Sequence, residues 1–269
     1  MRTATVIPRS NAAEREKRIN FILGAVVILL FLLAWELVGR LALVNPLFTS
    51  SPSRAVRALV AITCDGTLLK HLTTSGTEFL LGFAAAVLVG LPVGIILGWF
   101  KLANSAFGPF VAAMQATPRI ALMPLFIIWF GLGITSKIVI VMLSAVFPLI
   151  VNLQVAMSTI DGDLVRVARS YGASRWQIFW TVALPTSVPF LITALRLAAG
   201  RGMLGVIAAE VFGGSQGLGY MIQYAGSTFQ TDKVFAGVAV VAAMGITLDT
   251  LFRRIGRRFE KWRGEAAVS

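Results

Sequence analysis

The stretch DGDLVRVARSYGASRWQIFWTVALP, residues 161–185, is a polar and aromatic segment between two long apolar runs. Asp161 or Asp163 is suited to cap a short helix, and Gly172 supplies the permissive backbone that ends such a helix. Ser174 is placed to cap a second helical turn. The segment therefore predicts a compact helix-turn-helix with exposed aromatic side chains.

The composition around this segment is that of an integral membrane protein. Hydrophobic residues make up 57% of the 269 residues and charged residues only 13%, against about 25% charged residues in soluble domains. The net charge of +12 is typical of basic residues beside membrane spans, and we prefer this explanation to nucleic-acid binding. One cysteine and one histidine, Cys64 and His71, exclude a disulfide framework and a Cys/His metal cluster within one chain. We expect both to lie in a loop.

The chain is long enough for one all-α membrane domain with about six spans of about 20 residues each. We expect a cytoplasmic N-terminal tail at residues 1–20, a single transmembrane domain at 21–252, a cytoplasmic loop at 159–186 and a basic cytoplasmic tail at 253–269. Pro185 falls where the fifth apolar run begins, a position at which its missing N–H costs least. The predicted spans are 21–43, 77–99, 107–130, 137–158, 187–209 and 234–252.

The distribution of Lys and Arg predicts the orientation. Fifteen of them lie in the predicted inner segments and five in the predicted outer loops, where Lys137 is counted as a surface residue. Because cytoplasmic segments carry an excess of Lys and Arg, we expect both termini and the 159–186 loop in the cytoplasm.

Small residues recur every four positions in the second run, at Gly82, Ala86, Gly90, Gly94 and Gly98. This spacing predicts a smooth stripe on which another helix packs closely. Pro92 is expected to bend the same run.

Polar residues inside the spans have two interpretations, either contacts between packed helices or the lining of a translocation path. The candidates in the third and fifth runs are Gln115, Thr117, Arg119, Arg201 and Glu210. Arg119 and Arg201 would favour an oxyanion. For Arg196, Arg201 and Glu210 we favour structural pairing, and Glu36 and Arg40 are spaced to pair on one face. The glycine-rich 213–219 segment lacks the G-x-x-x-x-G-K-[S/T] pattern and is expected to be a turn.

The 161–185 segment by itself is compatible with an ordinary interfacial loop that holds Trp and Arg at headgroup level. It also resembles the cytoplasmic signature E-A-A-x3-G-x9-I-x-L-P of bacterial ATP-binding-cassette (ABC) importer permeases. Ala168, Gly172, Val182, Leu184 and Pro185 are in register, whereas Arg166 and Val167 stand at the Glu and first Ala positions. Further segments, including TPRIALMPLFIIWFGLGITSKI and AAEVFGGSQGLGYMI, resemble permeases of the nitrate, taurine and aliphatic sulfonate importer branch.

The resemblance implies a type I importer permease of the bacterial inner membrane that forms a homodimer, with two cytoplasmic ATPase copies below and an external solute-binding protein above. It implies import of a small anion such as a sulfonate or nitrate. ATP and Mg would be bound by the ATPase, and this chain would hold no cofactor, metal or catalytic residue. The residues implied in ATPase coupling are Arg166, Ala168, Arg169, Tyr171, Gly172, Ala173, Ser174, Trp176, Leu184 and Pro185.

Two other classes are compatible with an apolar chain of this length. A proton-coupled secondary transporter would use acids in the spans, here Glu36, Glu78, Glu210 and Asp249. It gives no reason for the register of the 161–185 segment, and six spans without an obvious repeat are few for that class. A structural membrane protein gives no reason for the polar groups inside the spans.

Overall fold

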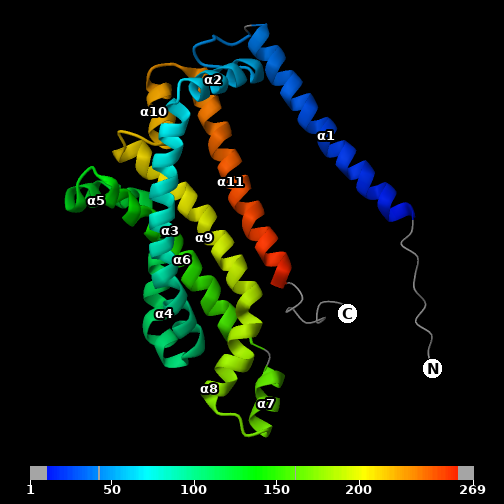
Figure 1. The fold of residues 1–269 in the computed structure, drawn as a ribbon, viewed down its shortest axis with the longest axis vertical. Helices are drawn as coiled ribbons and strands as arrows, with labels where there is room; N and C mark the ends of the chain where they lie inside the picture. Colours follow the sequence, from blue (N-terminus) through cyan, green and yellow to red (C-terminus); the bar gives the residue numbers. More distant parts are fainter. Residues whose placement is uncertain (1–10, 42, 161, 260–269) are drawn as a thin grey trace.

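The computed structural model describes residues 11–41, 43–160 and 162–259. The remaining parts of the two predicted tails, and Asp161, lie outside these residues. Within them the chain is helical, without a strand (Figure 1). The helices are α1 (Asn11–Arg40), α2 (Pro52–Cys64), α3 (Thr67–Trp99), α4 (Lys101–Ala116), η1 (Arg119–Leu122), α5 (Met123–Phe130), α6 (Ile134–Ser158), α7 (Gly162–Ser170), α8 (Arg175–Ile178), η2 (Phe179–Ala183), α9 (Leu184–Gly213), α10 (Leu218–Ser227) and α11 (Thr231–Phe259).

Five helical stretches are long and apolar enough to cross a membrane, and a sixth is formed if α4 is taken together with η1 and α5. This agrees with the predicted number of spans. The predicted span at 107–130 is not one straight helix, because the chain bends by 85° between residues 116 and 119. Thr117 is extended at ψ 130° before Pro118, as expected for a residue that precedes proline.

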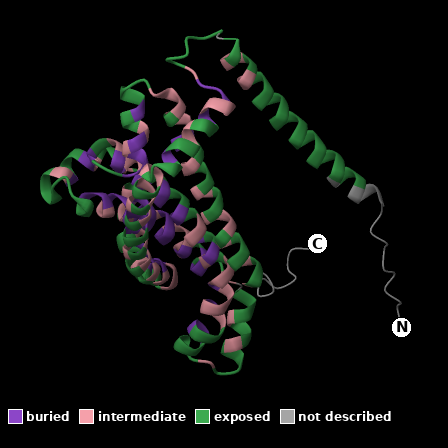
Figure 2. Ribbon diagram, turned by 45° about the horizontal axis from the view of Figure 1, so that its top comes forward, coloured by how far each residue is buried: buried purple, intermediate pink, exposed green. Residues whose placement is uncertain are grey.

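The core lies where α3, α6 and α9 pack together, and Figure 2 shows the buried residues gathered there. The predicted small-residue stripe of α3 faces α6. A Cβ atom added to Gly82 would lie 2.5 Å from Val141 Cβ, and one added to Gly98 would lie 2.4 Å from Met157 Cβ. Pro92 lies inside a continuous helix. The close contacts at Gly82 and Gly98 show that the small residues of the stripe let α3 and α6 approach more closely than larger side chains would permit.

Helix α3 begins ten residues before the predicted span, at Thr67. In its polar first turns the hydroxyl groups find acceptors within the helix, as Thr73 Oγ1 donates to Leu69 O at 2.9 Å and Thr77 Oγ1 to Thr73 O at 2.8 Å. His71 therefore lies in a helix, and the prediction of a loop is wrong for it. Cys64 is exposed at the last residue of α2.

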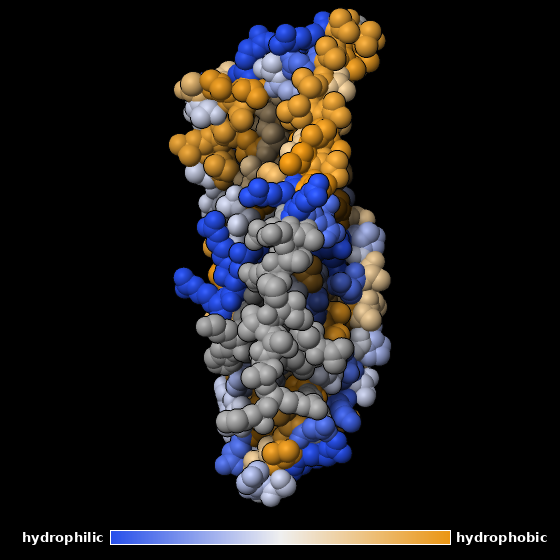
Figure 3. All heavy atoms as spheres, turned by 90° about the vertical axis from the view of Figure 1, so that its right-hand side faces the viewer, coloured by the Kyte–Doolittle hydropathy of each residue, from blue (hydrophilic) through white to orange (hydrophobic). Residues whose placement is uncertain are grey.

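Helix α1 stands apart from the bundle along most of its length (Figure 1). Its hydrophobic side chains are exposed, for example Phe21 at 78%, and they form a hydrophobic stripe on the face seen in Figure 3. Its last turns are held by contacts with the chain around α2. The Trp35 indole donates to Ser50 O at 2.8 Å, and Glu36 accepts from Ser53 N at 3.0 Å while pairing with Arg40 at 2.6 Å, as the spacing predicts.

Candidate functional site

The 161–185 segment folds into two helical pieces that project from one end of the bundle (Figure 1). Helix α7 ends at a turn in which Gly172 has φ +76° and donates to Arg169 O. Ser174 then caps α8 in a capping box, with its hydroxyl accepting from Gln177 N and Gln177 Oε1 accepting from Ser174 N. The predicted helix-turn-helix is present, with both predicted turn residues in their expected conformations.

The second half of this segment is helical without interruption into the fifth span. Leu184 N donates to Phe179 O, which makes a wide i to i+5 turn in η2, and Pro185 follows in the first turn of α9. The helix continues from Arg175 to Gly213, across the predicted loop boundary at residue 186. A wide turn of this kind is frequent at functional sites. It joins the projecting segment directly to a span.

Two aromatic side chains of this segment are exposed beside its charged residues, one in the turn after α7 and one in α8. Tyr171 is 87% exposed and Trp176 is 61% exposed. Beneath Trp176, Phe179 is buried, stacked on the Trp176 ring at 5.3 Å between ring centroids and edge-on to Trp99 at 5.2 Å. Exposed apolar side chains held on a rigid, buried base are typical of a protein interaction surface.

The predicted coupling residues are not all equivalent in the structure. Arg166, at the position of the signature Glu, forms an exposed ion pair with Asp163 one turn earlier. Arg169 lines a cavity behind the loop. Ala168 and Ala173 are half-buried in the segment, and Gly172 and Ser174 shape the turn. Leu184 and Pro185 are half-buried in the first turn of α9 and form no part of the projecting face.

The structure brings together four of the five residues predicted to line a path. Gln115 and Thr117 flank the break after α4, where the Arg119 guanidinium donates to Gln115 O at 2.8 Å and to Met114 O at 3.1 Å. It also lies 5.6 Å from the centroid of the Phe147 ring. Arg201 of α9 is within electrostatic reach of Arg119. The break therefore presents two neighbouring cations and no paired acid among the described residues.

The fifth predicted residue, Glu210, lies elsewhere and has no exposed surface. Its carboxylate accepts from Ser75 Oγ at 2.5 Å and from Gly219 N at 2.6 Å. Leu218 N donates to the same Ser75 hydroxyl at 2.8 Å. Glu210 therefore fixes the 213–219 turn against α3 and is not grouped with the other four residues.

A buried ion pair close to Glu210 is absent from the sequence-based expectations. Lys137 Nζ of α6 lies 2.7 Å from Glu78 Oε1 of α3, with the two side chains 6% and 2% exposed. The prediction that Lys137 marks a surface is wrong. Glu78 and Lys137 are 59 residues apart, the same separation as the stripe contacts Gly82 with Val141 and Gly98 with Met157. The pair thus continues the packing of α3 on α6, but this becomes visible only when the two helices are placed side by side.

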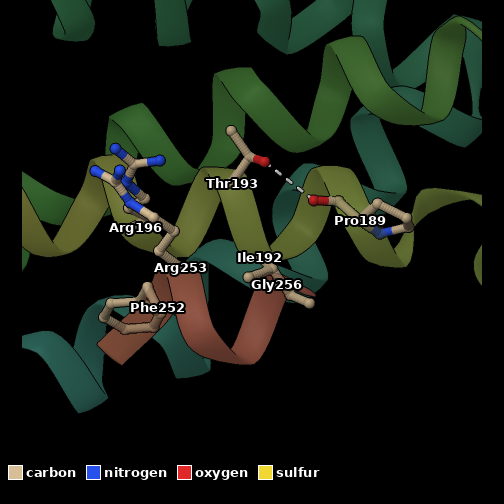
Figure 4. Close-up of a pocket in the computed structure, with 7 residues that line it drawn as sticks. All are labelled: Pro189, Ile192, Thr193, Arg196, Phe252, Arg253 and Gly256. Atoms are coloured by element: carbon tan, nitrogen blue, oxygen red, sulfur yellow. Dashed lines mark hydrogen bonds between the residues drawn. The ribbon is translucent and has the colours of Figure 1, made fainter. Parts of the chain in front are cut away.

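A further ion pair joins α9 to α11, in agreement with the pairing predicted for Arg196. Asp249 accepts from Arg196, and its second oxygen lies 2.6 Å from Arg253 Nη2. Figure 4 shows Arg196 and Arg253 lying together beside a cavity of about 180 Å³, with Thr193 donating to Pro189 O. Each cation at this cavity is therefore already bound to a carboxylate of the chain itself.

Residues 90–261, more than half of the chain, match the family described as the binding-protein-dependent transport system inner membrane component. The chain belongs to this family. This permease is 35% identical over 254 residues to the taurine transport system permease protein of Escherichia coli K12, with 93% of this chain and 92% of that protein covered. It is 33% identical to a putative aliphatic sulfonates transport permease protein of Bacillus subtilis 168, with 96% and 95% covered. The resemblance to ABC importer permeases of this branch is confirmed.

The fold of this permease is similar to that of a solved importer. A chain of the inward-facing MetNI methionine ABC transporter superimposes with a TM-score of 0.64 at 20% identity, covering 72% of this chain and 96% of that chain. The prediction of an all-α, type I importer permease fold is thereby confirmed.

Proposed function

We propose that this permease passes a small organic anion of the sulfonate class from an external binding protein into the cytoplasm, driven by an ATPase that docks on α7 and α8. The docking role rests on one observation: Trp176 is exposed on the projecting segment, and its ring stacks on the buried ring of Phe179. In this proposal both termini and the α7–α8 end of the bundle lie in the cytoplasm. Two permease copies form the path, and two ATPase copies bind beneath them.

The anionic class of the solute is supported by the two neighbouring cations at the break between α4 and η1. Arg119 is held by backbone carbonyls and by no carboxylate of the described residues, so its positive charge is available to a passing anion. The named relatives that transport taurine and aliphatic sulfonates support the same class. A sulfonate accepts hydrogen bonds from guanidinium groups, as other oxyanions do.

The proton-coupled alternative is weakened by the partners of its four candidate acids. Glu36 is bound to Arg40 and Ser53, Glu78 to Lys137, and Asp249 to two arginines. Glu210 is bound to Ser75 and to a backbone amide. Each acid is therefore engaged in holding segments together.

The test replaces Trp176 by Ala in the host strain and measures two quantities, the amount of ATPase that co-purifies with the permease and the uptake of radiolabelled taurine. We expect both quantities to fall at least fivefold. An aromatic residue at the centre of a protein interface commonly contributes about 2 kcal/mol or more to the binding free energy, which is roughly a factor of 30 in affinity. Wild-type uptake should be inhibited by excess alkanesulfonate and not by a neutral amino acid.

The matched control is Trp129→Ala, since Trp129 of α5 is also 61% exposed but lies far from α7 in the chain. It should leave ATPase co-purification unchanged. Normal co-purification with Trp176→Ala would contradict the docking role. Uptake that continues after the partner ATPase is inactivated and stops when the proton gradient is removed would favour the secondary transporter.

A further inference from the structure

A second cavity, of about 530 Å³, lies between the α3–α4 turn and the α7–α8 segment. Three cationic side chains line it, from three different helices: Lys101 of α4, Arg169 of α7 and Arg175 of α8. Asn104 and two serines add polar groups, and Trp99 and Met157 contribute to an apolar wall. The cavity therefore combines a cationic lining with a hydrophobic side.

The charge of this cavity is not balanced by the part of the chain that the structure describes. None of the described residues that line it is acidic, and Lys101 and Arg169 form no ion pair with a described residue. Arg175 lies over the faces of Trp99 and Phe100, at 6.0 and 5.7 Å from their centroids. The cavity of Figure 4 differs in this respect, because Asp249 binds both of its arginines, Arg196 and Arg253.

Of the uncharged polar groups, Ser105 and Ser158 donate their hydroxyl protons to Lys101 O and Val155 O, whereas Asn104 presents its amide as a donor. Gln154 Nε2 donates to Asn104 Oδ1 at 2.6 Å, so the acceptor of Asn104 is used and its amide N–H groups remain free to donate. Three cations and an amide donor with no carboxylate among the described lining residues favour an anion, and guanidinium groups match the geometry of a phosphate.

The position of the cavity favours a lipid as the source of that anion. Trp99 is the last residue of the α3 span, and Trp residues mark the membrane–water interface. Leu102 and Phe107 of α4, the next helix, are 85% and 61% exposed, so apolar side chains near the cavity have no protein cover. Basic pockets between transmembrane helices at the interface are known to bind acidic lipid headgroups.

We propose that this cavity binds the headgroup of an anionic phospholipid, with Lys101, Arg169 and Arg175 donating to its phosphate. The phosphate then joins the α3–α4 turn to both helices of the projecting segment. Bound lipid therefore steadies the segment against the bundle, which makes its position dependent on the charge of the surrounding lipid. This inference does not depend on the identity of the transported solute.

The test titrates dioctanoyl phosphatidylglycerol into the purified full-length permease in a neutral detergent and counts bound lipid by native mass spectrometry. We expect tighter binding than for dioctanoyl phosphatidylcholine, and a dissociation constant raised about fivefold for each cation replaced in the series K101Q, R169Q and R175Q. The matched control is Arg254→Gln, an exposed cation of α11 that lines neither this cavity nor that of Figure 4. It should leave the tight binding unchanged.

The variants K101R and R169K keep the charge and should retain at least half of the wild-type affinity, which separates loss of charge from loss of folding. Equal binding of the two lipids, an unchanged dissociation constant in the triple Gln variant, or loss of binding in monodisperse K101R would overturn the proposal. Displacement of the lipid by inorganic phosphate at the same concentration would also overturn it and would indicate a site for free anions.

Discussion

Gly172 has a left-handed backbone at φ +76° in the turn between α7 and α8, and a Cβ added there would meet nothing within 4 Å. Its requirement for glycine is therefore conformational and not steric. An Ala residue in this region costs about 1–2 kcal/mol, so Gly172→Ala should lower the fraction of permease whose segment is correctly shaped. We expect ATPase binding to weaken by about fivefold to thirtyfold, measured by the affinity of the purified ATPase for permease in nanodiscs.

The neighbouring Gly162 provides the matched control for this prediction. A Cβ added to it would also meet nothing within 4 Å, but Gly162 begins α7 without a positive φ. Gly162→Ala should bind the ATPase as the wild type does, because Ala favours the helix. If Gly172→Ala binds as tightly as Gly162→Ala, the turn does not depend on a left-handed residue.

At the scale of elements, the packing of α3 on α6 depends on the small-residue stripe. A Cβ at Gly82 would lie 2.5 Å from Val141 Cβ and 2.9 Å from Ile138 O, a backbone atom that cannot move independently. Gly82→Ala should therefore destabilise the permease by about 1–3 kcal/mol, seen as a lower midpoint of thermal unfolding in detergent.

Gly76→Ala is the control on the same helix, because nothing lies within 4 Å of its added Cβ. It should leave the midpoint unchanged or raise it slightly, since Gly inside a helix costs about 0.5–1 kcal/mol relative to Ala. An equal loss of stability in both variants would show that glycine matters for reasons other than close approach.

The elements that the sequence predicts correctly are those whose determinants are local. A Gly or Ala at every fourth position defines one helix face without reference to a partner, and Gly172 with Ser174 defines a turn. The break after Thr117 is not predicted, because the presence of a proline does not show whether a helix ends there or continues. Pro92 and Pro148 lie inside continuous helices of this permease, whereas Pro118 ends one. The residues around a proline do not show whether packing against a neighbouring helix keeps the chain helical there.

At the scale of the whole molecule, the buried ion pair could not be predicted because its two members are brought together only by the packing of α3 on α6. A rule that counts Lys and Arg beside spans places Lys137 at a surface, and the same residue is 5% exposed in the fold. For the same reason, the sequence suggests that Glu78 belongs to a proton path and that Glu210 belongs to a proton path or to the lining of the translocation path. Their structural partners, Lys137 and the 213–219 turn, are recognised only in the packed fold.

The Glu78–Lys137 pair allows a prediction on how the bundle is held together. Glu78 Oε2 has no hydrogen-bond donor among the described residues, so the carboxylate depends on Lys137 for its neutralisation. Lys137→Met should destabilise the permease by about 3–5 kcal/mol, because it leaves a buried charge without its partner. The double variant Lys137→Met/Glu78→Leu should recover most of that loss, since an apolar pair of similar volume replaces a buried ion pair at little cost. The midpoint of thermal unfolding in detergent measures both effects.

The partly exposed pair between Arg54 and Asp232, at 3.0 Å and with side chains 28% and 32% exposed, is the control for this cycle. It also joins two helices, but water screens it, so Arg54→Met should change stability by no more than about 1 kcal/mol. Comparing Lys137→Met with Arg54→Met shows whether the loss of stability comes from the burial of an ion pair or simply from its joining two helices. If the double variant is as unstable as Lys137→Met, the charges themselves are needed by Glu210 and the 213–219 turn beside them, and the ion pair and that turn form one cooperative unit.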